Sequence, residues 1–150
     1  MRRLAGEIGV TQPVVYSAFA GGRQALVDAV AEAGFDALAA ALEAVDPEPL
    51  ARMRAYLEFA GAQPHLYEAM FSMPSGLPFG AGDVPAPLQR AFLALEVAFP
   101  GPDDTRAEVA WATLHGLATL QNGGRLPASR AEARLQQAYD RLSGSATGGL

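Results

Sequence analysis

The sequence predicts an all-α fold, with a partial helix-turn-helix head followed by a helical bundle. Apolar residues recur at three- to four-residue spacing through most of the chain, as they do on the buried face of a helix. We find no alternating Val/Ile/Thr run bounded by turns, which is the pattern of a strand. With 150 residues, half of them hydrophobic, the chain can form one substantial core or two small packed units.

A long helix is predicted over residues 23–44, and a second helix follows the VDPEP stretch. Asp46 can cap this second helix with Pro47 in its first turn, where a missing amide costs little. The predicted inner face of the long helix consists of Leu26, Val30, Ala33, Leu38, Leu42 and Val45. The second helix carries a stripe of Leu50, Met53, Leu57 and Ala60, with Tyr56 and Phe59 beside it.

Four more helices are predicted in the rest of the chain. Pro64 fits the first turn of one and Pro74 ends it, before the turn-rich SGLPFGAGDVPAP loop. The last two begin at the capping-box sequences TRAE (105–108) and SRAE (129–132), in which a hydroxyl precedes a glutamate by three residues. The inner face of the first helix after the loop is Leu88, Phe92, Leu95 and Phe99. That of the last helix is Leu135, Ala138, Tyr139 and Leu142.

Charge and composition exclude several classes of function. The net charge of −5 argues against a generally basic nucleic-acid coat, although three arginines against one glutamate give residues 1–27 a charge of +2 and leave −7 on residues 28–150. The absence of cysteine excludes disulfides and thiolate metal sites. No segment is long and apolar enough to span a membrane, so we expect a cytoplasmic protein without membrane partners.

The two histidines, His65 and His115, do not indicate a metal or catalytic site. They are far apart in the sequence, and no HxxxH pairing accompanies them. No nucleophile, base and orienting acid have the spacing of a catalytic set. His115 lies on a nearly all-apolar helix, where a hydrogen-bonded core histidine is the usual case, although it can still donate to a ligand. We therefore expect no enzymatic activity, no metal and no cofactor.

The start of the chain fits a helix-turn-helix. Gly9 permits the positive φ that ends a helix sharply, and Thr11 can cap the next helix with Pro13 in its first turn. The side chains left on the outer face of this second helix, suited to base edges in a major groove, are Thr11, Gln12, Val14 and Ser17. Tyr16 and Arg23 can contact phosphates. A helical hairpin without any role in DNA binding fits the same spacing.

The stretch LAGEIGVTQPVVYSAFAGGRQALVDAV resembles the DNA-binding segment of the TetR family of transcriptional repressors. The residues that match the family pattern are Ala5, Gly9, Val10, Thr11, Tyr16, Phe19, Leu26 and Val30. The AGGR turn is one residue longer than usual, and Arg23 stands where a lysine is common. Family members place a further helix before this point, so we expect the first helix of the DNA-binding domain to be missing, through an internal methionine taken as the start or through truncation.

Residues 46–143 resemble the ligand-binding and dimerisation domain of the TetR branch that is named for a Trp-His-Gly signature. The matching segments are PHLYEAMF and WATLHGLATLQNGGRLP, which contain Trp111, His115 and Gly116 in the expected order. The resemblance implies a DNA-binding head and connecting helix over residues 1–45 and the ligand-binding and dimerisation domain over 46–143. We expect residues 144–150 to be a disordered tail.

Large, soft side chains in the middle helices can line an apolar ligand pocket. Ordinary core packing explains any one of them equally simply. With the resemblance, the expected pocket residues are Tyr56, Phe59, Tyr67, Met70, Phe71, Phe92, Trp111 and His115.

The last two helices are the expected dimer interface. The helix over 105–121 is apolar nearly all round, so we expect it to be buried on more than one side. Two helices from each subunit would form a four-helix bundle, in which small residues permit close approach. The expected interface residues are Ala112, Gly116, Leu117, Leu120, Leu135, Tyr139 and Leu142.

The resulting hypothesis is a ligand-responsive TetR-type repressor. It binds operator double-stranded DNA as a homodimer, and a small apolar or aromatic effector releases it. The alternative is a truncated regulator, a helical dimer that binds a small molecule or a partner protein and does not bind DNA.

Overall fold

The computed structural model describes residues 22–72 and 84–144, and all regular structure within these ranges is helical. The predicted all-α class is therefore confirmed. The elements are α3 (Gly22–Glu43), α4 (Pro49–Ala62), α5 (Pro64–Met70), α6 (Ala86–Ala98), α7 (Thr105–Asn122), the short 3₁₀ helix η1 (Ala128–Arg130) and α8 (Ala131–Gly144).

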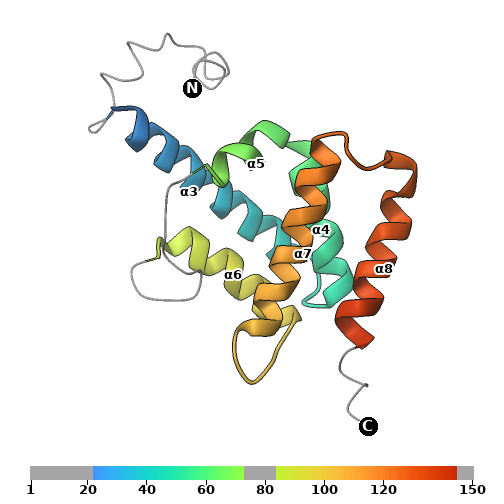
Figure 1. The fold of residues 1–150 in the computed structure, drawn as a ribbon. Helices are drawn as coiled ribbons and strands as arrows, with labels where there is room; N and C mark the ends of the chain where they lie inside the picture. The colour runs from blue at the N-terminus through green and yellow to red at the C-terminus, as the bar shows by residue number, and fades with distance from the viewer. Residues whose placement is uncertain (1–21, 73–83, 145–150) are drawn as a thin grey trace.

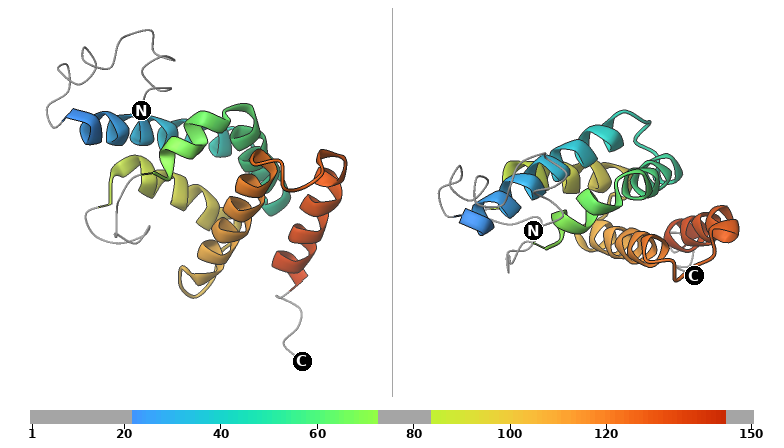
Figure 2. Two further views of the ribbon diagram at one scale, coloured as in Figure 1. Left: turned by 45° about the horizontal axis from the view of Figure 1, so that its top comes forward. Right: turned by 90° about the horizontal axis from the view of Figure 1, so that it is seen from above.

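The helices form a layered bundle around α3 and α4 (Figure 1). The long helix α3 packs against α5 on one side and α6 on the other, and both views of Figure 2 keep these neighbours together. The helix α4 packs against α7 and α8. The second half of α3 shares one hydrophobic core with α4–α8, so the helix that leads from the N-terminal segment is anchored in the bundle.

The inner faces of the helices follow the predicted stripes on α6 and α8 more closely than on α3. All four predicted α6 residues are buried, and Leu135 anchors α8 in the core. On α3, Ala33 was expected to face inward but is exposed, whereas Gly34 and Phe35 are buried. Because α3 has packing partners on two sides, its buried surface is wider than the single stripe that the spacing predicted.

Three predicted helix starts are wrong by one to two residues. The helix α4 is capped by Glu48, whose carboxylate accepts hydrogen bonds from the amides of Leu50 and Ala51, and not by Asp46. Pro49 then occupies the first turn. Thr105 is already helical, and its amide and hydroxyl donate to Asp103. Before α8, Ser129 lies inside η1, so its capping box does not form.

Arg52 is a buried cation that connects three helices. From α4, its guanidinium donates to the carbonyl of Ala94 near the end of α6 and to the carbonyl of Val45 just after α3. Carbonyl groups at a helix C-terminus carry partial negative charge and favour a cation. Arg52 therefore holds the C-terminal ends of α3 and α6 against α4.

Exposed ion pairs fasten the outer helices. Arg90 on α6 contacts both Asp36 and Glu43 on α3, and Arg54 on α4 makes a two-pronged pair with Glu132 on α8 at 2.7 Å for each oxygen. The guanidinium groups lower the pKa of Glu43 and of Glu132. Exposed pairs of this kind contribute little stability each, so they orient helices that the core already holds.

Candidate functional site

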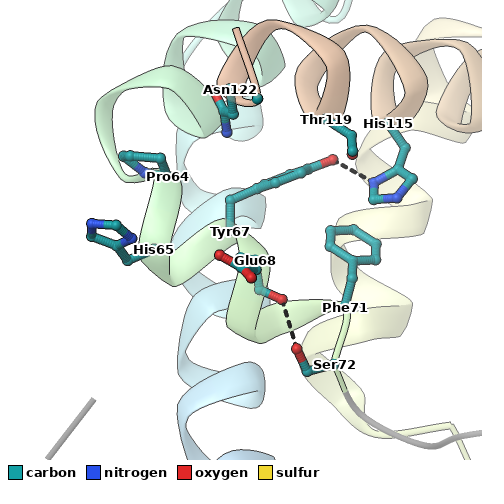
Figure 3. Close-up of a pocket in the computed structure, with 10 residues that line it drawn as sticks. Pro64, His65, Tyr67, Glu68, Phe71, Ser72, His115, Thr119 and Asn122 are labelled. Carbon is teal, nitrogen blue, oxygen red and sulfur yellow. Dashed lines mark hydrogen bonds between the residues drawn. The ribbon is translucent and has the colours of Figure 1, made fainter. Parts of the chain in front are cut away.

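A cavity of about 600 Å³ lies between α5 and the second half of α7. Its volume is within the usual range for small-molecule sites, roughly 300–1,000 Å³. Helical spacing explains which side chains meet there, because residues three or four apart share one face of each helix. The lining residues are Pro64, His65, Tyr67, Glu68, Phe71, Ser72, His115, Thr119, Asn122 and Gly123 (Figure 3).

Three aromatic rings form one wall of this cavity. Tyr67 extends from α5 to His115 on α7, and Phe71 lies beside the imidazole (Figure 3). The ring centres of Phe71 and His115 are 4.2 Å apart, and those of Tyr67 and Phe71 are 4.9 Å apart. Such a wall favours contact with a flat, apolar molecule.

A chain of hydrogen bonds runs from this wall into the core. The hydroxyl of Tyr67 is 2.7 Å from Nδ1 of His115 and 2.5 Å from the hydroxyl of Tyr56. Burial raises the pKa of both tyrosines, so both hydroxyls stay protonated at neutral pH. For Tyr56, the hydrogen bond with Tyr67 opposes this rise by lowering the pKa of the Tyr56 hydroxyl. Tyr56, Tyr67 and His115 therefore join the cavity to the centre of the bundle.

Protonation of His115 is expected to cost stability in mildly acidic solution. Burial lowers the pKa of His115 below its ordinary 6.5, so below about pH 6.5 the unfolded chain binds a proton that the folded chain does not. Stability is then complete above this value and falls as the pH decreases towards the folded-state pKa. Urea unfolding at about pH 7.5 and about pH 5.5 should show this loss.

Two histidine variants isolate the contribution of His115 to this pH dependence. His115→Gln should reduce the difference in unfolding free energy between the two pH values, and His65→Gln, which changes an exposed histidine, should retain it. The lowered pKa values of Glu43 and Glu132 act only below about pH 4.5, outside this window. An unchanged difference in His115→Gln would contradict the assignment.

Some of the expected pocket residues line the cavity, and the others are buried in the core. Tyr67, Phe71 and His115 line the cavity. The others are buried among other side chains of the core and do not line it: Tyr56, Phe59, Met70, Phe92 and Trp111. Periodicity identifies side chains that point inward, but it does not tell whether they meet a packed core or a cavity.

Polar residues of the cavity were missed by the sequence analysis. They are His65, Glu68, Ser72, Thr119 and Asn122. The available signal was positional, because Glu68 follows Pro64 by four residues and Thr119 follows His115 by four. The same faces of the two helices, followed from Pro64 and from His115, would have indicated the other residues that line the cavity.

The expected dimer residues fall into two groups. Leu135 is buried within the subunit, and Tyr139 and Leu142 pack against the same core. On α7, by contrast, Val109 and Leu120 are 56% and 45% exposed and lie on one face with Ala112 and Gly116. The expectation that α7 is buried on more than one side is thus not met within one subunit.

Most of the expected DNA-contacting residues lie outside the described ranges, namely Thr11, Gln12, Pro13, Val14, Tyr16 and Ser17. The predicted helix end at Pro74 is outside them as well. Arg23 is described, and its side chain is exposed in the first turn of α3.

Within residues 22–72 and 84–144, no three His, Asp or Glu side chains are grouped so that they could hold a metal ion. No helix there is both long enough and apolar enough to cross a membrane.

The helical bundle and its cavity define a regulatory domain of the tetracycline repressor type. Residues 49–143 match the family described as "tetracyclin repressor-like, C-terminal domain", and the chain belongs to this family. A domain of this type points to a regulatory rather than a catalytic protein. A solved structure from Rhodococcus sp. RHA1, a protein with unknown function, is 30% identical and superposes with a TM-score of 0.62, over 96% of this chain and 82% of the other. No curated protein matches the chain significantly.

Proposed function

We propose that the protein is a ligand-responsive TetR-type transcriptional repressor. It binds operator DNA as a dimer, and a small apolar or aromatic effector in the α5–α7 cavity releases the DNA. The membership of the tetracycline repressor-like family supports the regulatory role. The aromatic wall of Tyr67, Phe71 and His115 supports an effector of this chemistry.

The helix α5 lines the cavity and also packs directly on α3, so it connects an effector to the helix that follows the N-terminal segment. Gly34 of α3 lies so close to α5 that a Cβ atom there would be 2.4 Å from Cγ of Met70. An effector that displaces α5 therefore acts on the helix that leads to the N-terminal segment. A change in the position of α3 would alter the separation of two DNA-binding heads, which is a shift between two states.

The DNA-binding part of the proposal rests on the N-terminal segment. Thr11, Gln12, Val14 and Ser17 would contact base edges, Pro13 would start the recognition helix, and the phosphate contacts would come from Tyr16 and Arg23. Residues 1–27 carry a net charge of +2, whereas residues 28–150 carry −7. A positive N-terminal segment suits a DNA-binding head that contacts phosphates.

Fluorescence anisotropy tests whether the protein binds DNA. The DNA is taken from the region that flanks the gene of this protein. We expect binding that prefers particular sequences, weakens as salt rises and is reversed by an effector. Gln12→Ala should change the sequence preference while the melting temperature stays the same. Binding that is absent or independent of sequence would overturn the proposal. It would favour the alternative, a helical dimer that binds a small molecule or partner protein without DNA.

The exposed face of α7 is the proposed centre of the dimer interface. Gly116 lies in the middle of α7, where glycine costs about 1 kcal/mol relative to alanine, yet a Cβ there would meet nothing within 4 Å in the subunit. The close approach of a second copy explains this choice. Leu117 and Leu120 would extend the contact.

Sedimentation velocity tests the dimer. We expect the unmodified protein to sediment as a dimer and Ala112→Glu to sediment as a monomer, since a carboxylate would be buried without a partner. Ala29→Glu, on the exposed side of α3, is the matched control and should leave the dimer intact. A dimer in Ala112→Glu would exclude this face.

A further inference from the structure

The polarity of the hydrogen-bond chain behind the cavity follows from its inner tyrosine. The hydroxyl of Tyr56 is buried, and its acceptor among the described residues is the hydroxyl of Tyr67, 2.5 Å away. Because a buried hydroxyl that donates to nothing is costly, Tyr56 donates to Tyr67. The single proton of the Tyr67 hydroxyl is then directed to Nδ1 of His115 at 2.7 Å.

This polarity determines which nitrogen of His115 carries the proton. Since Nδ1 accepts from Tyr67, a neutral imidazole must hold its proton on Nε2. Burial lowers the pKa of His115 and so favours the neutral form. Among the residues that the structure describes, Nε2 has no hydrogen-bond partner, and the His115 side chain lines the cavity. The Nε2–H group of His115 is therefore a hydrogen-bond donor in a fixed position at the cavity.

The charges of the residues that line the cavity indicate which kind of ligand group can accept a hydrogen bond from Nε2–H of His115. The described lining contains the carboxylate of Glu68 and neither lysine nor arginine. An anionic ligand would meet the carboxylate of Glu68 with neither a lysine nor an arginine to offset the repulsion, whereas an uncharged carbonyl group avoids that repulsion. The rings of Tyr67 and Phe71 at the same wall favour a flat aromatic body next to the carbonyl.

We propose that the cavity binds uncharged aromatic carbonyl compounds, whose carbonyl oxygen accepts a hydrogen bond from Nε2–H of His115. The inference rests on the proposed ligand-responsive function and names the chemistry of its effector. It also gives Tyr56 and Tyr67 the role of positioning residues, because they hold the tautomer of an imidazole that contacts the ligand.

Three naphthalene probes of one shape test this ligand class: 2-acetylnaphthalene, 2-ethylnaphthalene and 2-naphthoate. The intrinsic fluorescence of Trp111, the single tryptophan, reports binding. We expect the ketone to bind about 5- to 10-fold more tightly than the hydrocarbon, which is the usual contribution of one hydrogen bond, and more tightly than the anion. His115→Phe keeps a ring against Phe71 but removes the donor, so the ketone and the hydrocarbon should then bind equally.

The tautomer of His115 is measured independently in the unmodified protein. The ¹⁵N shifts of its imidazole, assigned with the His65→Gln variant, should show the proton on Nε2. Tyr67→Phe, which removes the donor to Nδ1, should allow the other tautomer to appear. A proton on Nδ1 in the unmodified protein, equal binding of ketone and hydrocarbon, preference for the anion, or no binding of the ketone would each overturn the inference.

The two proposals fail in different ways. If the ketone binds as expected but leaves DNA binding unchanged, the ligand class stands and the repressor mechanism fails. If a compound without a carbonyl group releases DNA while the ketone does not bind, the repressor stands and the ligand class fails.

Discussion

Trp111→Ala is expected to lower the free energy of unfolding by about 3–5 kcal/mol, the usual loss when a large buried aromatic residue is truncated. The side chain of Trp111 is 3% exposed. Its ring centre is 6.2 Å from that of Phe35 on α3, 6.4 Å from that of Tyr56 on α4 and 5.9 Å from that of Phe92 on α6. The indole therefore connects α7 to three helices at once, and its removal leaves a cavity that none of them fills alone.

Thermal and urea unfolding measure this loss, which corresponds to a decrease in melting temperature of roughly 10 °C for a chain of this length. Trp111→Phe is the matched variant, because it keeps most of the ring but removes the N–H. It should lose much less stability than Trp111→Ala, because most of the buried aromatic surface stays in place. If Trp111→Ala unfolds at the same urea concentration as the unmodified protein, the indole is not a central packing element.

The sequence predicted the helices well because apolar residues recur along them at helical spacing. On α6, Leu88, Phe92 and Leu95 all meet the core as expected. On α3, helices pack on two sides, so a single stripe missed Gly34 and Phe35. The position of a helix end depends on which side chain accepts hydrogen bonds from the free amides of the first turn. Several polar residues near a boundary can do this, so the sequence does not identify the capping residue.

The cavity was predicted less well for a physical reason. Hydrophobic spacing identifies inward-facing side chains, and Tyr56 and Tyr67 satisfy it equally. Which of them borders an empty space depends on the distance between α5 and α7, a tertiary property. The contact of Tyr67 with His115 joins residues 48 positions apart, and no local pattern reports such a pairing.

Gly34→Ala is expected to disturb both stability and the response to effector, because α3 and α5 touch at this position. A Cβ atom at residue 34 would lie 2.4 Å from Cγ and 2.8 Å from Sδ of Met70, and 3.2 Å from Cδ1 of Leu66. Met70 is buried, so its side chain cannot move into solvent. The helix α5 has seven residues and no side-chain cap, which makes it the easier of the two helices to displace.

We expect Gly34→Ala to cost about 1–3 kcal/mol through overpacking, which outweighs the roughly 1 kcal/mol that alanine gains in a helix. Gly61→Ala is the matched control: it lies in α4, where a Cβ atom would meet nothing within 4 Å, so only the propensity gain should appear. Met70→Ala opens space at the same point. The double variant Gly34→Ala/Met70→Ala should therefore be more stable than the sum of its single losses.

The same variants separate packing from signalling. If α5 transmits effector binding to α3, Gly34→Ala should change the effector concentration needed to release DNA, and Gly61→Ala should not. Met70→Ala in the Gly34→Ala background should move this concentration back towards the unmodified value, because it relieves the overlap that displaced α5. A Gly34→Ala variant that is as stable and as responsive as Gly61→Ala would mean that this contact does not constrain α5. The route from the cavity to the N-terminal segment would then have to pass through another helix.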